Sequence, residues 1–240
     1  MIGWMALEER RGWRSRMEEI RLEGLRVCRA GIPAPDGLSP AALTRRVKRG
    51  AQLLRKAGCR RCLTPPDFPF WDLLHESGLQ AVDPGGLCRT MAAQLAGAYL
   101  EEHGVRETGA TVALLGSRVD RSLFDAACTL APRVRHLVIR AGEEGRELSR
   151  WLEREYGIPA LENGRGAQVK LWFTRPEEEA GPEDLVLCAP ALSLGGLELH
   201  PRRSVPPEVE ARAFAALLWE EGRLALEDIE ISSRTAAQMT

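Results

Sequence analysis

Apolar residues along the chain recur with the period of helices in some stretches and with that of strands in others. Helical spacing and capping residues predict helices over residues 4–23, 40–56, 68–77, 86–104, 119–131, 143–156 and 207–221. Short apolar or alternating runs predict strands over residues 25–29, 61–64, 79–83, 111–116, 134–140, 168–173, 184–189, 192–199 and 230–232. Continuously apolar runs at 112–115 and 185–187 are typical of parallel strands covered on both faces. The chain is therefore predicted to be an α/β protein.

The N-terminal segment has a helical pattern. Trp13, Met17 and Ile20 are spaced as one face of a helix, and five arginines and five glutamates of residues 4–23 surround them. A helix that lies on a membrane surface normally has a positively charged polar face, whereas this one is neutral. We therefore expect residues 1–24 to form an amphipathic helix that packs against its own protein.

The turn after the predicted strand 111–116 is the main candidate site. A dinucleotide-binding turn has the pattern G-x-G-x-x-G, and the three glycine positions here hold Gly116, Arg118 and Arg121. The next helix begins here, and Ser117 or Asp120 can cap it. A helix N-terminus favours anions, and two guanidinium groups beside it suit a phosphate or carboxylate. The alternative is a vestigial turn whose arginines are only solvated.

Arg140 ends the next predicted strand, 24 residues after Gly116. Dinucleotide-binding domains usually place an acidic residue there for the ribose hydroxyls, whereas an arginine suits a 2′-phosphate. If a dinucleotide binds, NADP is therefore expected rather than NAD. The candidate ligand-binding residues are Gly116, Ser117, Arg118, Arg121 and Arg140.

The order of elements, with Gly116 and Arg140, resembles the two-lobed plan of amino-acid-dehydrogenase-like proteins of the Rossmann-like NAD(P)-binding superfamily. The resemblance covers roughly residues 25–200. It implies a Rossmann-like, mostly parallel sheet, a smaller N-terminal α/β lobe and a connecting helix. The expected parts are an N-terminal helix at 1–24, a small α/β lobe at 25–85, a connecting helix at 86–104, a Rossmann-like lobe at 105–232 and a flexible tail at 233–240.

Charge is distributed unevenly along the chain. Its net charge is −1, but residues 1–62 contain fifteen Lys and Arg against six Asp and Glu. The predicted helix and turn at 40–61 contain no acidic residue, and Ser39 and Pro40 are suited to begin the helix. This segment is either a solvated face or a contact for an acidic protein partner. We do not expect nucleic acid as a partner of this segment, because no aromatic residue is interleaved among these basic residues.

The remaining motifs indicate neither a metal site nor a catalytic site. Six cysteines occupy mostly apolar or helical contexts, and Cys59-Arg-Arg-Cys62 follows a helix instead of opening one, as a reactive C-x-x-C does. No second cysteine or histidine pair completes a zinc site, and no nucleophile motif is present. We expect no metal and can name no catalytic residue.

No apolar run reaches the roughly 20 residues of a membrane span, and a cytoplasmic location is expected.

Two functional hypotheses remain open. The first is a protein that binds a nucleotide or another small anionic ligand near Gly116, such as a diverged reductase. The second is a non-catalytic interaction or regulatory protein that keeps the fold as a scaffold and binds an acidic partner through its basic N-terminal lobe.

Overall fold

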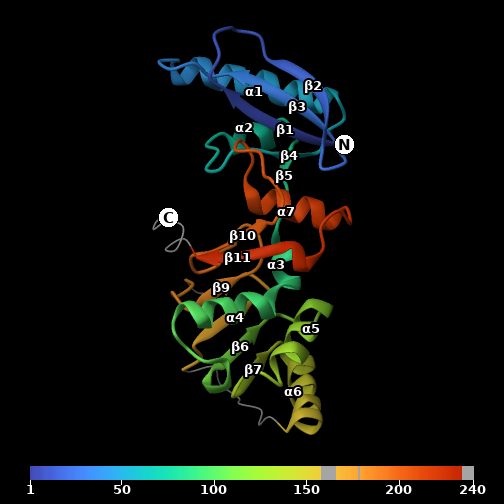
Figure 1. Ribbon diagram of the computed structural model, residues 1–240, viewed down its shortest axis with the longest axis vertical. Helices are drawn as coiled ribbons and strands as arrows, with labels where there is room; N and C mark the ends of the chain where they lie inside the picture. Colours follow the sequence, from blue (N-terminus) through green and yellow to red (C-terminus); the bar gives the residue numbers. More distant parts are fainter. Residues whose placement is uncertain (158–165, 178, 234–240) are drawn as a thin grey trace. The chain divides into compact units, whose positions relative to one another are not determined.

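The computed structural model describes residues 1–157, 166–177 and 179–233, and the chain divides into two compact units (Figure 1). Unit 1 comprises Met1–Asp83 and Pro201–Ile229, and unit 2 comprises Pro84–His200 and Glu230–Thr240. The flexible tail predicted at 233–240 lies outside the described residues except for Ser233.

Unit 1 is built on a five-stranded sheet in the order β2-β3-β1-β4-β5. Its strands are β1 (Ile2–Glu8), β2 (Arg16–Leu22), β3 (Leu25–Pro33), β4 (Arg61–Leu63) and β5 (Gln80–Ala81). Strands β3, β1, β4 and β5 are parallel, and only the edge strand β2 is antiparallel to its neighbour. The helical elements of this unit are α1 (Pro40–Lys56), α2 (Trp71–Glu76), α7 (Ala211–Glu220) and the short η2 (Leu226–Asp228).

Helix α1 forms where its capping and apolar signals predict it. The Ser39 side chain accepts a hydrogen bond from the Ala42 N–H, and the buried side chains of α1 join the core cluster that contains Met5 and Ile32. Helix α1 packs so closely on β3 that a Cβ added at Gly50 would lie only 2.4 Å from Ile32 Cδ1.

Unit 2 contains a four-stranded, fully parallel sheet in the order β7-β6-β8-β9. Its strands are β6 (Thr111–Leu115), β7 (His136–Arg140), β8 (Val169–Trp172) and β9 (Asp184–Val186). Its helical elements are α3 (Gly85–Thr90), α4 (Ala92–Glu102), η1 (Glu107–Gly109), α5 (Arg121–Leu130) and α6 (Gly142–Tyr156). Strands β10 (Leu197–Pro201) and β11 (Ile229–Ser233) form a separate two-stranded sheet. Alternation of parallel strands and helices makes this a Rossmann-like α/β fold.

The predicted N-terminal helix at 1–24 is wrong, because these residues contain the strands β1 and β2. Strand β1 is central: Trp4 pairs in register with Arg29 on one side and Leu63 on the other. Its residues 3–6 are all buried, as in a strand covered on both faces. The apparent helical face was coincidental, because Trp13 and Met17 are 62% and 47% exposed.

The domain expectation for residues 105–232 also needs correction, because residues 201–229 belong to unit 1. The Trp4 indole N–H donates to the Glu208 carbonyl at 3.3 Å, and the Glu210 N–H donates to the Thr64 carbonyl at 2.9 Å. Arg61 forms an ion pair with Glu220 in the same unit. These long-range contacts tie the late segment to the early strands, and no local pattern encodes them.

The predicted connecting helix at 86–104 is two helices, α3 and α4, which meet at Met91 and belong to unit 2. Helix α7 begins at Ala211, because the Glu210 side chain caps it by accepting from the N–H groups of Arg212 and Ala213. In the described part of the chain, no helix is both long enough and apolar enough to cross a membrane.

Candidate functional site

The structure places Gly116 and Arg140 side by side at the carboxyl edge of the unit 2 sheet. Leu115 at the end of β6 is in register with Arg140 at the end of β7, and the Gly116 N–H donates to the Arg140 carbonyl at 2.9 Å. Ligands of open α/β sheets bind beyond this edge. The turn therefore has the position expected of a Rossmann-like site.

Gly116 lies where helix and strand pack closely. A Cβ at this position would lie 3.1 Å from Leu123 Cδ1 and 3.3 Å from the Arg118 carbonyl oxygen. Leu123 is fully buried in the first turn of α5, so the clash would fall on a side chain that has little room to move. The glycine thus shapes the turn, whatever the turn binds.

The N-terminus of α5 already carries carboxylates from the chain itself. Asp120 Oδ1 accepts a hydrogen bond of 2.9 Å from the Leu123 N–H. Glu144 Oε2 accepts a second one, of 2.8 Å, from the Val119 N–H. Both groups lie where the helix dipole and unpaired N–H groups favour negative charge. Internal carboxylates thus take two of the donors that a bound phosphate would use.

The predicted arginines do not converge on the turn as a group. The Arg121 side chain is 93% exposed, and its Nε lies 3.4 Å from Asp125 Oδ2, one turn further along α5. Ser117, Arg118 and Arg140 are also exposed. Within the described ranges, neither Arg118 nor Arg140 has an ion-pair partner within 4.0 Å. The structure therefore gathers Gly116, Ser117, Arg118 and Arg140 at one sheet edge and directs Arg121 elsewhere.

The sequence reasoning missed Glu144. It lies in the first turn of α6, 25 residues after Val119, and it reaches the β6–α5 turn from there. Gly142 (φ 64°) occurs where the chain leaves β7 and enters α6. The local sequence signal for this contact was only that two acidic residues stand at the start of a predicted helix. Such residues ordinarily do no more than interact favourably with the helix dipole.

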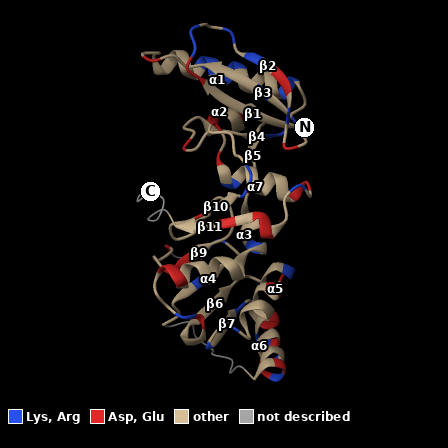
Figure 2. Cartoon of the chain, in the orientation of Figure 1, with Lys and Arg blue, Asp and Glu red and all other residues tan. Residues whose placement is uncertain are grey.

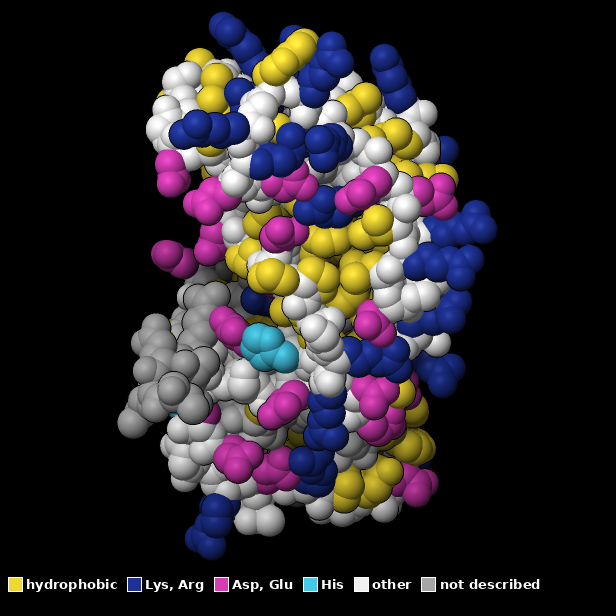
Figure 3. All heavy atoms as spheres, turned by 45° about the horizontal axis from the view of Figure 1, so that its top comes forward, with side chains coloured by type: hydrophobic (Ala, Val, Ile, Leu, Met, Phe, Trp, Pro, Cys, Tyr) yellow, Lys and Arg dark blue, Asp and Glu magenta, His cyan; other side chains and the backbone are white. Residues whose placement is uncertain are grey.

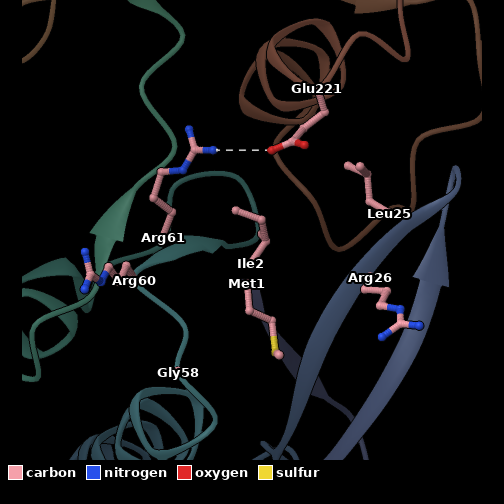
Figure 4. Close-up of a pocket in the computed structure, with 8 residues that line it drawn as sticks. All are labelled: Met1, Ile2, Leu25, Arg26, Gly58, Arg60, Arg61 and Glu221. Carbon is pink, nitrogen blue, oxygen red and sulfur yellow. Dashed lines mark ion pairs between the residues drawn. The ribbon is translucent and has the colours of Figure 1, made fainter.

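A separate cavity of about 430 Å³ lies in unit 1, at the amino ends of its parallel strands (Figure 4). It is lined by Met1, Ile2, Leu25, Arg26, Gly58, Arg60, Arg61 and Glu221. Arg61 is held by the ion pair with Glu220 and lies 3.9 Å from Glu221, while the Arg26 and Arg60 side chains extend away from Ile2 in Figure 4. The three arginine side chains therefore do not point together into the cavity, as they would around a bound anion.

The C-x-x-C cysteines are core residues. Cys59 and Cys62 are buried, and both belong to the core cluster around α1. Burial, with smaller effects of the neighbouring thiols, raises the pKa of Cys59 to about 11 and that of Cys62 to about 12. Both side chains are therefore neutral thiols at pH 7 and poor nucleophiles. Among the residues that the structure describes, no group of three or more His, Cys, Asp and Glu side chains is arranged to hold a metal ion.

Helix α1 exposes a basic face (Figure 2). Arg45, Arg49 and Lys56 are exposed, and none of them has an ion-pair partner in the described part of the chain. Lys48 lies 4.0 Å from Glu76, whereas Arg46 points inward and donates to the Pro33 carbonyl. The charge excess is smaller than residues 1–62 suggest, because unit 1 as a whole has nineteen Lys and Arg and sixteen Asp and Glu.

Comparison with known proteins shows a distant structural likeness. No protein-family model matches the chain, and no curated protein matches it significantly. Among solved structures, the chain is similar to the L-tryptophan dehydrogenase from Nostoc punctiforme, with 15% identity and a TM-score of 0.30. The match covers 60% of this chain and 43% of that enzyme.

Proposed function

We propose that this protein is a non-catalytic interaction or regulatory protein that keeps a Rossmann-like fold as a scaffold. The observation that carries the proposal is the occupied turn: Glu144 and Asp120 accept hydrogen bonds from the Val119 and Leu123 N–H groups. A phosphate bound there would have to displace or approach two carboxylates, and like charges in one site repel each other. The turn is thus closed to an anion by the chain itself.

The partner in this proposal is an acidic protein that binds the basic face of α1. Arg45, Arg49 and Lys56 project from one side of a helix whose other side is buried in the core. Fixed positive charges on a rigid helix attract an acidic surface and speed its association. No acidic residue occurs between Asp36 and Asp67, so the helix itself offers no competing charge.

A second function is favoured by one specific observation. Arg118 and Arg140 are exposed beside Gly116, and no carboxylate pairs with them among the described residues. These two cations suit a small anionic ligand, and NADP is the dinucleotide that an arginine at the end of β7 would favour. In this alternative, the ligand lies outside the carboxylate-filled helix end and contacts the two guanidinium groups.

Thermal unfolding with NADPH, NADH, ATP and inorganic phosphate distinguishes the two functions. The scaffold proposal predicts that none of these ligands raises the unfolding temperature of the wild-type protein. Stabilisation by NADPH that disappears in Arg118→Ala/Arg140→Ala would overturn it in favour of ligand binding, because only ligands of the folded state stabilise.

Binding to a 20-residue poly-glutamate peptide tests the acidic partner. Arg45→Glu/Arg49→Glu/Lys56→Glu is expected to abolish peptide binding at low salt. The matched control is Arg146→Glu/Arg150→Glu/Arg154→Glu on α6, an exposed helix of similar length in unit 2. Equal loss in both variants would mean that the peptide responds to net charge alone and would contradict a site on α1.

A further inference from the structure

The loop between β1 and β2 displays an aromatic side chain among arginines. Trp13 is 62% exposed, and the Arg14 guanidinium lies 4.7 Å from the centroid of its ring. Arg11, Arg14 and Arg16 are exposed as well. Figure 3 shows apolar atoms bordered by Lys and Arg side chains at the top of the molecule, which faces the viewer there. Residues 10–16 contain four arginines and no acidic residue.

The loop is anchored to the sheet at its base. Arg10 forms an ion pair with Glu8, and its Nη2 donates to the Arg14 carbonyl at 3.2 Å. Burial alone would raise the pKa of Glu8, but Arg10 and Arg29 lower it below the ordinary value, so the carboxylate stays charged. Gly12 (φ 139°) supplies a conformation that other residues rarely adopt. These contacts hold the base of the loop, and Trp13 is exposed beyond it.

The fold does not account for this exposed tryptophan. Large aromatic side chains usually bury most of their surface, whereas the Trp13 ring is mostly exposed, with the Arg14 guanidinium over it. Arg10 is committed to Glu8, whereas Arg11, Arg14 and Arg16 pair with no carboxylate in the described ranges. An aromatic ring and three guanidinium groups without a carboxylate partner in the described ranges thus lie together on one loop.

We propose that this loop binds single-stranded nucleic acid. Trp13 would stack on an unpaired base, and Arg11, Arg14 and Arg16 would contact the flanking phosphates. Stacking on an aromatic side chain together with cationic contacts to the backbone is the general chemistry of single-strand binding. The loop shares no residue with the basic face of α1, and it supplies the interleaved aromatic residue that residues 40–61 lack.

Single-stranded nucleic acid fits this loop better than two other anionic partners. An acidic peptide would use the arginines but gives no reason for an exposed indole. A membrane surface would use the indole, but insertion normally needs several apolar side chains, and the rest of the loop is polar or glycine. A base with phosphates on either side uses both kinds of group. Duplex DNA presents its bases already stacked, so the single strand should bind more tightly.

Fluorescence anisotropy with fluorescein-labelled oligo(dT) of 20 nucleotides tests the proposal with the full-length protein. Trp13→Ala is expected to weaken binding about five-fold or more, because stacking contributes about 1–3 kcal/mol per base. Trp151→Ala is the matched control, because Trp151 is 37% exposed on α6 in unit 2. This control should bind like the wild type. Both positions are exposed, and circular dichroism checks that each variant folds.

Salt dependence tests the arginines. Each phosphate contact with a single strand contributes about −0.7 to the slope of log K against log salt. Arg11→Ala/Arg14→Ala/Arg16→Ala should therefore make the slope shallower by about two, whereas Arg146→Ala/Arg150→Ala/Arg154→Ala on α6 should leave it unchanged.

Four outcomes would overturn the proposal. They are the absence of oligo(dT) binding at 50 mM salt, equal binding by Trp13→Ala, preference for a duplex of the same length, and Trp13-dependent binding to phosphatidylglycerol vesicles without oligonucleotide binding. The charge-reversal variant of α1 separates this proposal from the acidic-partner proposal. It should lose poly-glutamate binding and keep the Trp13-dependent binding of oligo(dT).

Discussion

The Glu144 carboxylate accepts a hydrogen bond of 2.8 Å from the backbone N–H of Val119, across 25 residues of sequence. It joins the start of α6 to the turn between β6 and α5. Negative charge near a helix N-terminus is stabilising, so the same contact strengthens the fold and occupies a donor that an anionic ligand would use. In the proposed scaffold function, this one contact both stabilises the fold and keeps an anion out of the turn.

Removing this carboxylate should weaken unit 2. Glu144→Ala leaves the Val119 N–H without its anionic partner, and we expect a loss of about 1–2 kcal/mol, at the lower end of charged hydrogen bonds because the side chain is exposed. Glu147→Ala is the control, because Glu147 is exposed on the same helix. Urea unfolding measures both. If Glu144→Ala instead gains stability in phosphate buffer, the turn binds anions once it is vacated.

The cap of α5 allows a second test at the same turn. Asp120→Ala removes the acceptor of the Leu123 N–H and should cost about 0.5–2 kcal/mol, whereas Asp120→Asn should keep most of the stability. Asp125→Ala breaks only the exposed pair with Arg121 and should change little. Chemical denaturation of the three variants checks the order. Equal losses for Asp120→Ala and Asp125→Ala would contradict the capping role.

Local signals predicted the parts of the fold that depend on local interactions. Ser39 and Asp120 were recognised as candidate caps, and both side chains accept the expected backbone N–H. The parallel strands of unit 2 were predicted because their apolar runs are short and nearly continuous. The pattern of dinucleotide-binding domains placed Gly116 and Arg140 in one candidate site, and their strands do end side by side.

Long-range pairing explains what the sequence did not reveal. Strand β2 is an edge strand with mostly exposed side chains, so it lacks the alternation that marks a half-buried strand, and Met17 matched a helical face by chance. Glu144 and Glu208 make their contacts 25 and 179 residues away in the sequence. Only the folded topology brings such groups together.

Arg29 should be a key contact within unit 1. Its guanidinium lies 2.7 Å from Glu8, 3.0 Å from Glu18 and 3.4 Å from Glu208, and only 19% of its side chain is exposed. Arg29→Ala would leave these carboxylates without their shared cation, and we expect a loss of about 1–3 kcal/mol. Arg26→Ala serves as the control, because Arg26 is 72% exposed and its ion pair with Glu19 spans 3.9 Å. A similar midpoint in urea for both variants would contradict this role.

Alkaline pH should destabilise unit 1 through its buried thiols. Burial raises the pKa of Cys62 from 9.0 in the unfolded reference to about 12, so the folded state keeps a proton that the unfolded state loses. Because stability falls wherever the unfolded state binds fewer protons, the free energy of unfolding should decline as the pH rises above about 9 and level off near 12. Cys59 adds to the same decline up to about pH 11.

Urea midpoints at pH 8, 9, 10 and 11 measure how the free energy of unfolding depends on pH. Cys62→Ala should make this slope shallower despite a lower starting stability. Cys128→Ala is the control: burial also raises the pKa of this half-buried thiol on α5, but not to the extent seen for Cys62, so the slope should change less than in Cys62→Ala. An unchanged slope in Cys62→Ala would show that the thiol does not titrate during unfolding.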